Sequence, residues 1–278
     1  MRLLKQLVAV AVVAFLGSLL VGAVQGNAVL ALIAGVATAL LALLTYAKVV
    51  RWTEHRDPVE VAREGAAASL GRGLLIGAAM FTAVILLIAL FGGYRVNGWG
   101  SVGGAVTLIG VTAAAAVTEE VMFRGVLFRI IEERLGTWGA LVLTGLVFGL
   151  MHIINPHATL WGALAIGIEA GWMLAAAYAA TRTLWLPIGL HFAWNYTEAG
   201  IFGTDVSGKT GSEGLLDGLT SGPAALTGGD FGPEASLVTV AAGLLVTWLF
   251  IRLARKRGAI VPRRRPLAPA EPGPTPAQ

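Results

Sequence analysis

The sequence predicts an all-α fold, a polytopic bundle of about eight transmembrane helices whose N- and C-termini both lie on the cytoplasmic side. Composition gives the first indication. Of the 278 residues, 56% are hydrophobic and only 13% are charged, whereas a soluble domain usually carries about 25% charge. The second indication is a series of apolar runs that reach or approach the roughly 20 residues needed to cross about 30 Å of hydrocarbon.

Eight apolar segments define the predicted helices. They cover residues 5–24, 28–48, 74–93, 102–128, 137–154, 159–180, 184–201 and 236–253. The first of them has basic residues before it and small residues after it, which is also the pattern of a signal peptide. We favour an uncleaved helix, because the run is long for a signal peptide and a second span follows almost at once.

The distribution of basic residues sets the orientation, because cytoplasmic loops of membrane proteins are enriched in Lys and Arg. With the N-terminus inside, 17 of the 20 basic residues fall in cytoplasmic segments. Arg95 and Lys209 fall outside, and Arg124 lies within a helix. Both ends of the chain are therefore predicted to be cytoplasmic, in a multi-pass protein of the cell (plasma) membrane.

Three segments between and after the helices are polar. Residues 51–73 are expected to form a charged cytoplasmic loop, with an amphipathic helix on the membrane surface as one form of it. Residues 202–235, rich in Gly, Ser, Thr and Asp, are expected to be a flexible external loop. The tail is basic and then proline-rich, which indicates disorder, with its basic part against anionic lipid. The chain thus divides into N-terminal helices with a cytoplasmic loop (1–100), a central helical core (101–201), an external loop with the last helix (202–253) and the tail (254–278).

Composition also limits the possible chemistry and partners. The chain has no cysteine, which excludes disulfides, thiolate metal ligands and cysteine nucleophiles. Its sequence pI is near 9.8, yet most basic residues sit beside apolar runs. We therefore attribute them to membrane orientation, and expect the lipid bilayer, and no nucleic acid, as a partner.

Several ionisable or amide side chains fall inside predicted helices, where a charge near the bilayer centre costs at least a few kcal/mol. They are Glu119, Glu120, Arg124, His152, Glu169, His191, Asn195 and Glu198. Such residues are candidates for function by default. Counted at about 1.5 Å per residue from the predicted helix ends, the first glutamate, both histidines and the asparagine fall in the middle half of the membrane. Their bias toward the inner half suggests access from the cytoplasm.

Spacing along each helix indicates which side chains share a face. Glu120 and Arg124 are four residues apart, so they stack on one face and can form an ion pair. Glu119 points about 100° away from that face and stays available for another partner. His191 and Asn195 are also four residues apart, and we expect them to share a face.

A carboxylate, two imidazoles and an amide within an apolar bundle suit a hydrolysis. Glu119 can take a proton from water while the histidines orient the water or protonate the leaving group. Asn195 and a histidine can donate hydrogen bonds to a developing oxyanion. Because Arg124 would hold Glu120 ionised, Glu119 is the favoured base.

Each of these residues also has a purely structural interpretation. A buried Glu120–Arg124 pair is on its own more often structural than catalytic, and an intramembrane histidine often only bonds a neighbouring helix. Glu169 lies between two glycines four residues apart, which permits close helix packing. It is equally explained as a supporting residue of the site or as a simply satisfied polar group. His157, in a short external loop, is expected to be solvated.

A zinc site is the competing chemistry, because Glu119, His152 and His191 are acceptable zinc ligands. The three residues come from separate helices, however, and no HExxH pair is present. We therefore expect neither a metal nor another cofactor.

Three short motifs occur in order on three predicted helices. Residues 119–124 read EExxxR, 148–152 read FxxxH and 191–195 read HxxxN. In this order they resemble the CPBP intramembrane proteases, the family of CAAX-processing endopeptidases of the Rce1 type and of bacteriocin-processing and immunity proteins, also called the Abi family. The resemblance covers about residues 102–200 and makes the region 101–201 the expected catalytic core.

The resemblance implies an intramembrane glutamic endopeptidase acting on a membrane-embedded or membrane-associated protein. The residues to which it gives a catalytic role are Glu119 (activation of water), His152 (assistance), and His191 with Asn195 (oxyanion site). Those with a supporting role are Glu120, Arg124 and Phe148. The sequence names neither the substrate nor any dependence on prenyl groups.

Two other functions stay open. A non-enzymatic immunity or scaffolding protein could retain the family's core, although a binding role does not need both glutamates and both histidines. A transporter also uses buried carboxylates, but no pair of broken helices occurs in matching halves of the chain.

Overall fold

The computed structural model describes residues 1–209, 211 and 213–264. Its α-helices are α1 (Arg2–Val24), α2 (Ala28–Glu54), α3 (Ala66–Leu90), α4 (Val102–Glu120), α5 (Arg129–Met151), α6 (Leu160–Ile166), α7 (Trp172–Thr181), α8 (Trp185–Asn195), α9 (Ala224–Thr227) and α10 (Leu237–Lys256). The strands are β1 (Tyr94–Trp99) and β2 (Leu216–Thr220). The π-helical segments are Val121–Phe128 after α4, Gly167–Gly171 between α6 and α7, and Tyr196–Ile201 after α8. The 3-10 turns are Val59–Val61, His152–Ile154, Gly229–Phe231 and Pro233–Ala235.

The predicted membrane-spanning bundle is confirmed. In the described part of the chain, six helical runs are long and apolar enough to cross a bilayer. One of them, Val102–Ile154, contains two predicted spans, because its helical geometry is broken at Gly136, where φ is 69° and ψ is 174°. The predicted span 184–201 is helical but shorter, with 11 residues in α8 and six more in its π-helical continuation. The chain is a multi-pass membrane protein.

Two helices extend beyond the spans that hydropathy predicts. α2 continues to Glu54, and α3 begins at Ala66. Hydropathy detects only the apolar part of a helix that fits the hydrocarbon, whereas the helical hydrogen bonds continue past it. Within residues 51–73 the connection therefore holds a 3-10 turn, Val59–Val61, in place of the predicted amphipathic helix.

The segment 202–235 is folded, so the prediction of a flexible loop is wrong for its described residues. β2 pairs antiparallel with β1, with Tyr94 opposite Thr220, and α9 and two 3-10 turns follow. The Asn155 amide nitrogen donates a hydrogen bond to the carbonyl oxygen of Ser207 at 2.7 Å. These contacts join residues far apart in the chain, which a local reading of glycine and serine content does not reveal.

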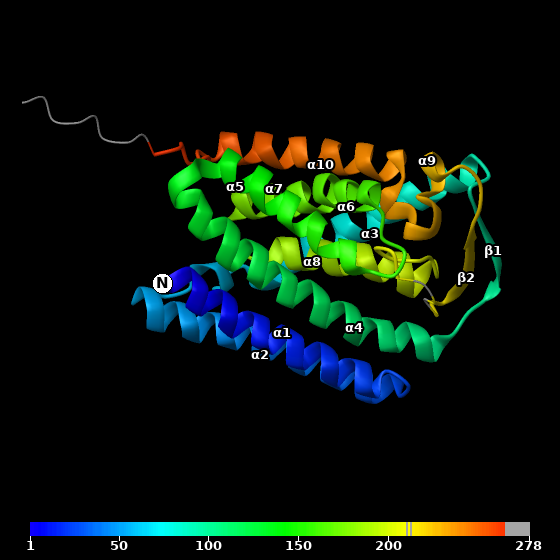
Figure 1. Cartoon of the computed structure of the whole chain (residues 1–278), viewed down its shortest axis with the longest axis horizontal. Helices are drawn as coiled ribbons and strands as arrows, with labels where there is room; N and C mark the ends of the chain where they lie inside the picture. The colour runs from blue at the N-terminus through cyan, green and yellow to red at the C-terminus, as the bar shows by residue number, and fades with distance from the viewer. Residues whose placement is uncertain (210, 212, 265–278) are drawn as a thin grey trace, which may run out of the picture.

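The helices form two flanks around a central pair. α1 and α2 pack along α4 on one flank, α10 packs on α7 on the opposite flank, and α3 packs on α8 (Figure 1). The N-terminus and the end of α10 lie at the same end of the bundle, and the β1–β2 ribbon lies at the other (Figure 1). This arrangement gives the bundle two chemically distinct ends.

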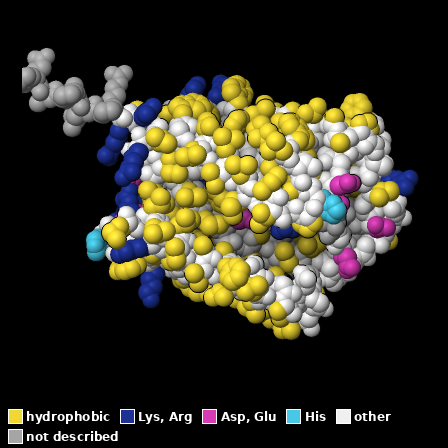
Figure 2. Space-filling view, in the orientation of Figure 1, with side chains coloured by type: hydrophobic (Ala, Val, Ile, Leu, Met, Phe, Trp, Pro, Cys, Tyr) yellow, Lys and Arg dark blue, Asp and Glu magenta, His cyan; other side chains and the backbone are white. Residues whose placement is uncertain are grey.

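The outer surface in Figure 2 is largely hydrophobic, and Lys and Arg side chains gather at one end of it. We call this the basic end; it comprises the start of α1, the α2–α3 connection, the Gly136 break and the end of α10. The enrichment of cytoplasmic loops in basic residues assigns it to the cytoplasm. The β1–β2 end is then the external end.

The predicted tail is only partly described. The Thr137 N–H donates to the carbonyl oxygen of Val261, and the Val261 N–H donates to the Thr137 hydroxyl at 2.8 Å. The chain after α10 therefore packs on the start of the second half of α5. Residues 265–278, for which disorder is predicted, lie outside the described residues.

Glycines bring α5 close to the α6–α7 run. A Cβ added at Gly171 would lie 2.8 Å from the Cα of Gly145, and one added at Gly149 would collide with the carbonyl oxygen of Ala163. Only glycine leaves room for this approach of two helices. The contact fixes the position of α5, which carries the FxxxH motif.

Candidate active site

A small cavity inside the bundle brings together the polar residues that the sequence singles out. Its volume is about 70 Å³. Its lining residues are Ala115, Glu119, Phe148, His152, Ile166, Ala170, His191, Asn195, Val206, Ser207, Lys209 and Glu234. All four predicted catalytic residues are among them, and they reach the cavity from α4, the end of α5 and α8.

Glu120 and Arg124 lie behind the cavity. Their side chains are 0% and 1% exposed, and Nη1 of Arg124 lies 2.7 Å from Oε1 of Glu120. Arg124 also donates to the carbonyl oxygen of Gly171 at 2.9 Å, and its guanidinium carbon lies 4.8 Å from the ring centre of Phe148. The ion pair predicted from the spacing of four residues is therefore present, and it ties α4 to the α6–α7 run.

His191 is held by the second glutamate of the EExxxR motif. Its Nδ1 lies 2.9 Å from Oε1 of Glu120. An ionised carboxylate can only accept a hydrogen bond, so Nδ1 carries the proton of this bond. The other ring nitrogen, Nε2, lies 3.8 Å from Oε2 of Glu119. The ring of His191 thus bridges the two glutamates.

Glu119 occupies a more open position than its neighbour. Its side chain is 30% exposed, whereas that of Glu120 is 0% exposed. The 3.8 Å separation from His191 is too long for a direct hydrogen bond. The Glu119 carboxylate therefore has room for a water molecule or a substrate group, as its offset from the Glu120 face predicts.

His152 and Phe148 form one packed unit at the end of α5. Nδ1 of His152 lies 2.8 Å from the carbonyl oxygen of Phe148, and a carbonyl can only accept, so Nδ1 donates. The Nε2 atom of His152 remains for the cavity. The ring centre of Phe148 lies 5.0 Å from that of His152 and 6.1 Å from that of His191. Phe148 therefore sets the spacing of the two imidazoles by packing against both.

Asn195 follows His191 by one turn on α8, at the edge of a π-helical segment. That segment, Tyr196–Ile201, begins at the next residue, and the segment Val121–Phe128 begins directly after Glu120. A π-helix has a wider turn than an α-helix and is frequent at functional sites. Two of the three motif helices therefore change geometry at the cavity.

Four further lining residues come from the external segment and are not singled out as site residues by the sequence: Val206, Ser207, Lys209 and Glu234. All four belong to the segment 202–235. Oε2 of Glu234 accepts a hydrogen bond from the Ser207 hydroxyl at 2.6 Å, and its Oε1 accepts one from Nε1 of Trp194 at 3.3 Å. The external segment is thereby fastened to α8. No local motif marks these residues, because their place in the site depends on long-range contacts.

Two intramembrane glutamates lie outside the cavity. Glu169 and Glu198 are fully buried, and neither carboxyl has a hydrogen-bond partner among the described residues. Glu169 therefore neither lines the cavity nor bonds a described group, and both interpretations of it stay predictions. His157 is exposed and does not line the cavity, in agreement with its predicted solvation.

Metal-ligand geometry gives no separate site. Among the described residues, no group of three or more His, Asp or Glu side chains has an arrangement that could hold a metal ion. Glu119, His152 and His191 line one cavity without forming such a group.

The fold and the cavity define a multi-pass membrane protein with ionisable groups gathered inside its helical bundle. Residues 101–197 match the Rce1-like family, described as type II CAAX prenyl endopeptidase Rce1-like. The match confirms, over this central segment, the resemblance of the three motifs to the CPBP family of CAAX-type membrane proteases.

A curated relative agrees with this family. Over 79 residues the chain is 29% identical to "Putative membrane peptidase YdiL" of Bacillus subtilis (strain 168). The alignment covers 28% of this chain and 30% of that protein, so it spans less than a third of the length of either. No solved structure matches the chain significantly.

Proposed function

We propose that this protein is an intramembrane endopeptidase that hydrolyses a peptide bond of a membrane-associated protein with a water activated by Glu119. The observation that carries this proposal is the different environment of the two adjacent glutamates. Glu120 is buried and committed to Arg124 and His191, whereas Glu119 faces the cavity with open space beside it.

Glu119 acts as the general base in this proposal. It accepts a proton from water while the water oxygen bonds to the carbonyl carbon of the scissile peptide. The carbonyl oxygen becomes an oxyanion. The buried Glu120–Arg124 pair does not line the cavity, so in this proposal it takes no direct part in the reaction.

His191 and Asn195 stabilise the oxyanion. Nδ1 of His191 donates to Glu120, and this carboxylate favours a second proton on Nε2. The Nε2–H and the Asn195 amide, one helical turn apart on α8, then donate to the same developing charge. Fixed donors in an apolar bundle are worth more than donors in water.

His152 protonates the leaving group. Its Nδ1–H is engaged by the Phe148 carbonyl, so the doubly protonated form of His152 passes its Nε2 proton to the departing amine. The C–N bond breaks as the C–O double bond reforms, and the proton taken up by Glu119 replaces the one delivered. The products are a carboxylate and an amine, with no cofactor required.

We propose that the protein resides in the plasma membrane, that residues 101–201 form its catalytic core, and that its substrate is embedded in or tethered to the same bilayer. The cavity lies among membrane-spanning helices, so a soluble protein would reach it only if one segment entered the bundle.

The first experiment is cleavage of a membrane-tethered peptide library by the purified full-length protein. The Glu119→Ala variant and a reaction with chelator run beside it. Cleavage that is lost in the variant and unchanged by chelator establishes a glutamic peptidase. Loss with chelator moves the assignment to a zinc-dependent protease. A cellular phenotype that survives Glu119→Ala favours the non-enzymatic immunity or scaffolding alternative.

A further inference from the structure

A second, larger cavity opens beside the candidate active site. Its volume is about 750 Å³, within the range of about 300–1,000 Å³ typical of ligand sites. Four residues line both cavities: Ala115, Asn195, Val206 and Lys209. We call the larger cavity the outer groove. The two spaces share a wall that includes the predicted catalytic residue Asn195, so the groove lies directly beside the site.

The outer groove lies at the external end of the bundle. Its walls come from the turn between α1 and α2, the first half of α4, and the segment after α8. These are the connections opposite the basic end (Figure 1). Lining residues such as Gly26, Gly104 and Thr107 are small, which leaves the helix backbones close to the open space.

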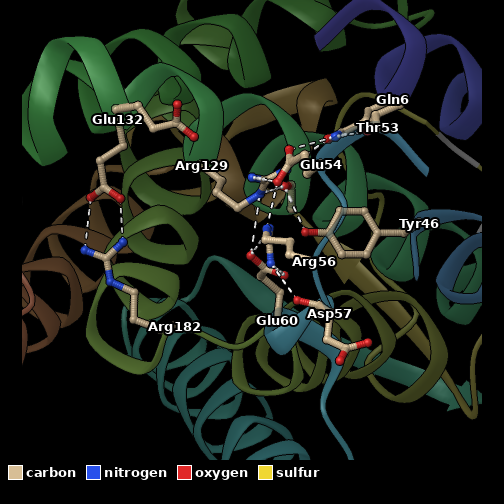
Figure 3. A network of polar contacts seen from close by, with 12 residues as sticks. Gln6, Tyr46, Thr53, Glu54, Arg56, Asp57, Glu60, Arg129, Glu132 and Arg182 are labelled. Atoms are coloured by element: carbon tan, nitrogen blue, oxygen red, sulfur yellow. Dashed lines mark hydrogen bonds and ion pairs between the residues drawn. The ribbon is translucent and has the colours of Figure 1, made fainter. Parts of the chain in front are cut away.

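The cytoplasmic end, in contrast, is closed by a polar network (Figure 3). Arg129 donates to both carboxylate oxygens of Glu54, at 2.7 and 2.9 Å, and to Gln6 at 2.9 Å. Arg56 donates to Glu54 at 2.7 Å and to Glu60 at 2.8 Å. The network joins α1, α2, the Val59–Val61 turn and α5 across the base of the bundle.

Buried apolar side chains fill the space between this network and the site, and the cavity at the basic end, which Met1, Arg2 and Glu133 help to line, shares no lining residue with the site. Tyr46, Phe128 and Tyr178 are each at most 2% exposed and belong to one apolar cluster. The Tyr46 hydroxyl donates to the carbonyl oxygen of Gly125 at 3.1 Å. Arg124, the residue before Gly125, is itself only 1% exposed. A substrate from the cytoplasm would have to displace this core.

We infer that the substrate reaches the site from the external face, as an extended polypeptide segment lying in the outer groove. The substrate class is then a membrane protein whose cleaved segment lies just outside the bilayer. This reverses the cytoplasmic access that helix depth suggests. The inference rests on the proposed function for the chemistry of cleavage, but the route itself is a property of the fold.

Labelling of single cysteines tests the route without any cleavage. The chain has no cysteine, so each introduced thiol is the one reactive group of its kind. Ala115→Cys places a thiol on the wall shared by both cavities, and Thr107→Cys places one farther out in the groove. Ala116→Cys is the matched control, because Ala116 is the next residue on the same helix and is itself 0% exposed. Glu64→Cys marks the cytoplasmic side.

Intact cells and inside-out vesicles are treated with a membrane-impermeant maleimide. We expect the Ala115 and Thr107 variants to react in intact cells about tenfold faster than the Ala116 variant, because thiol reactivity follows exposure. The Glu64 variant should react only in the vesicles. Reaction of the Ala115 variant in vesicles alone, or in neither preparation while the Thr107 variant shows that the protein is folded, overturns the external route.

A second arm separates the route from the proposed function. Two single-pass reporters carry the same library segment, one just outside the bilayer and one just inside. Cleavage of the outer reporter alone supports the inference, and cleavage of the inner reporter alone overturns it. External labelling of Ala115→Cys without cleavage of either reporter leaves the groove established and contradicts the peptidase assignment.

Discussion

Nδ1 of His191 lies 2.9 Å from Oε1 of Glu120, so the histidine is anchored by the buried glutamate rather than by the open one. This relationship separates two residues that are adjacent in sequence and identical in chemistry. Glu120 holds the ring and neutralises Arg124. Glu119 faces the other ring nitrogen across 3.8 Å and is left for the reaction.

Replacing each glutamate by glutamine should therefore affect different properties: catalysis for Glu119 and stability for Glu120. Glu119→Gln should fold normally and lose cleavage by at least about 10²-fold, because it removes the general base. Glu120→Gln should lower the free energy of unfolding by about 3–5 kcal/mol, because it leaves the Arg124 charge buried and unpaired. Thermal unfolding in detergent and cleavage of the library peptide measure the two effects. Equal destabilisation by both variants would contradict this division.

Removing the Asn195 amide should affect the chemical step. We expect Asn195→Ala to lower kcat by about 10²–10³-fold with little change in KM, as for the loss of one oxyanion donor. Asn97→Ala, at an exposed position of β1, is the control and should keep full activity. A rise in KM with kcat unchanged would instead assign Asn195 to substrate binding.

Filling the glycine contact should loosen the site from a distance. Gly149→Ala adds a methyl group against the Ala163 carbonyl oxygen, which should cost about 1–3 kcal/mol of stability and reduce cleavage by displacing His152. Gly71→Ala is the matched control, since a Cβ at this helical position meets nothing within 4 Å. It should be neutral or slightly stabilising. A Gly149 variant as stable and active as the control would show that the two helices adjust freely.

The two unpartnered glutamates should tolerate an amide. Neither Glu169 nor Glu198 has a donor among the described residues that would stabilise a charge, and a buried charge without a partner is very costly. Glu198→Gln and Glu169→Gln should therefore each change the free energy of unfolding by less than about 1 kcal/mol, unlike Glu120→Gln. A loss as large as that of the Glu120 variant would reveal a charge with a real partner at that position.

The cytoplasmic network should matter far more than an exposed pair beside it. Arg129→Gln breaks the two hydrogen bonds to Glu54. The side chains of Arg129 and Glu54 are 11% and 5% exposed, so the variant should lower the free energy of unfolding by about 3 kcal/mol. Arg51→Gln removes an ion pair with Asp57. The side chains of Arg51 and Asp57 are 59% and 86% exposed, so the variant should lower the free energy of unfolding by less than about 1 kcal/mol. Unfolding curves of both variants, compared at one detergent concentration, decide the matter.

The same network gives Arg56 an unusual environment. Burial by itself would lower the pKa of Arg56, but hydrogen bonds to Glu60 and Glu54 outweigh it, and the pKa is raised above its usual value. Arg56 therefore stays charged throughout the accessible range of pH. The closure of the cytoplasmic end should not open as the pH rises toward 10, and no thiol introduced at Ala115 should become reactive from inside over that range.

Much of the molecule follows from sequence periods and spacings alone. The bilayer imposes a length of about 20 apolar residues on each span, so the helices were predictable, and the spacing of four residues predicted the Glu120–Arg124 pair. The offset of Glu119 from that face follows from the helix turn. The motifs also indicated which residues gather at one site, because three ordered patterns on separate helices rarely occur together by chance.

Other features depend on contacts that no local pattern contains. The sequence by itself determined a membrane-spanning helical bundle, its basic end and the set of motif residues, since each depends on residues a few positions apart. Only the tertiary structure decided that Glu120 anchors His191, that Ser207 and Glu234 line the cavity, and that the outer groove opens away from the basic end. The reason is physical: these features depend on how distant segments pack, and packing is set by the shapes of many side chains at once.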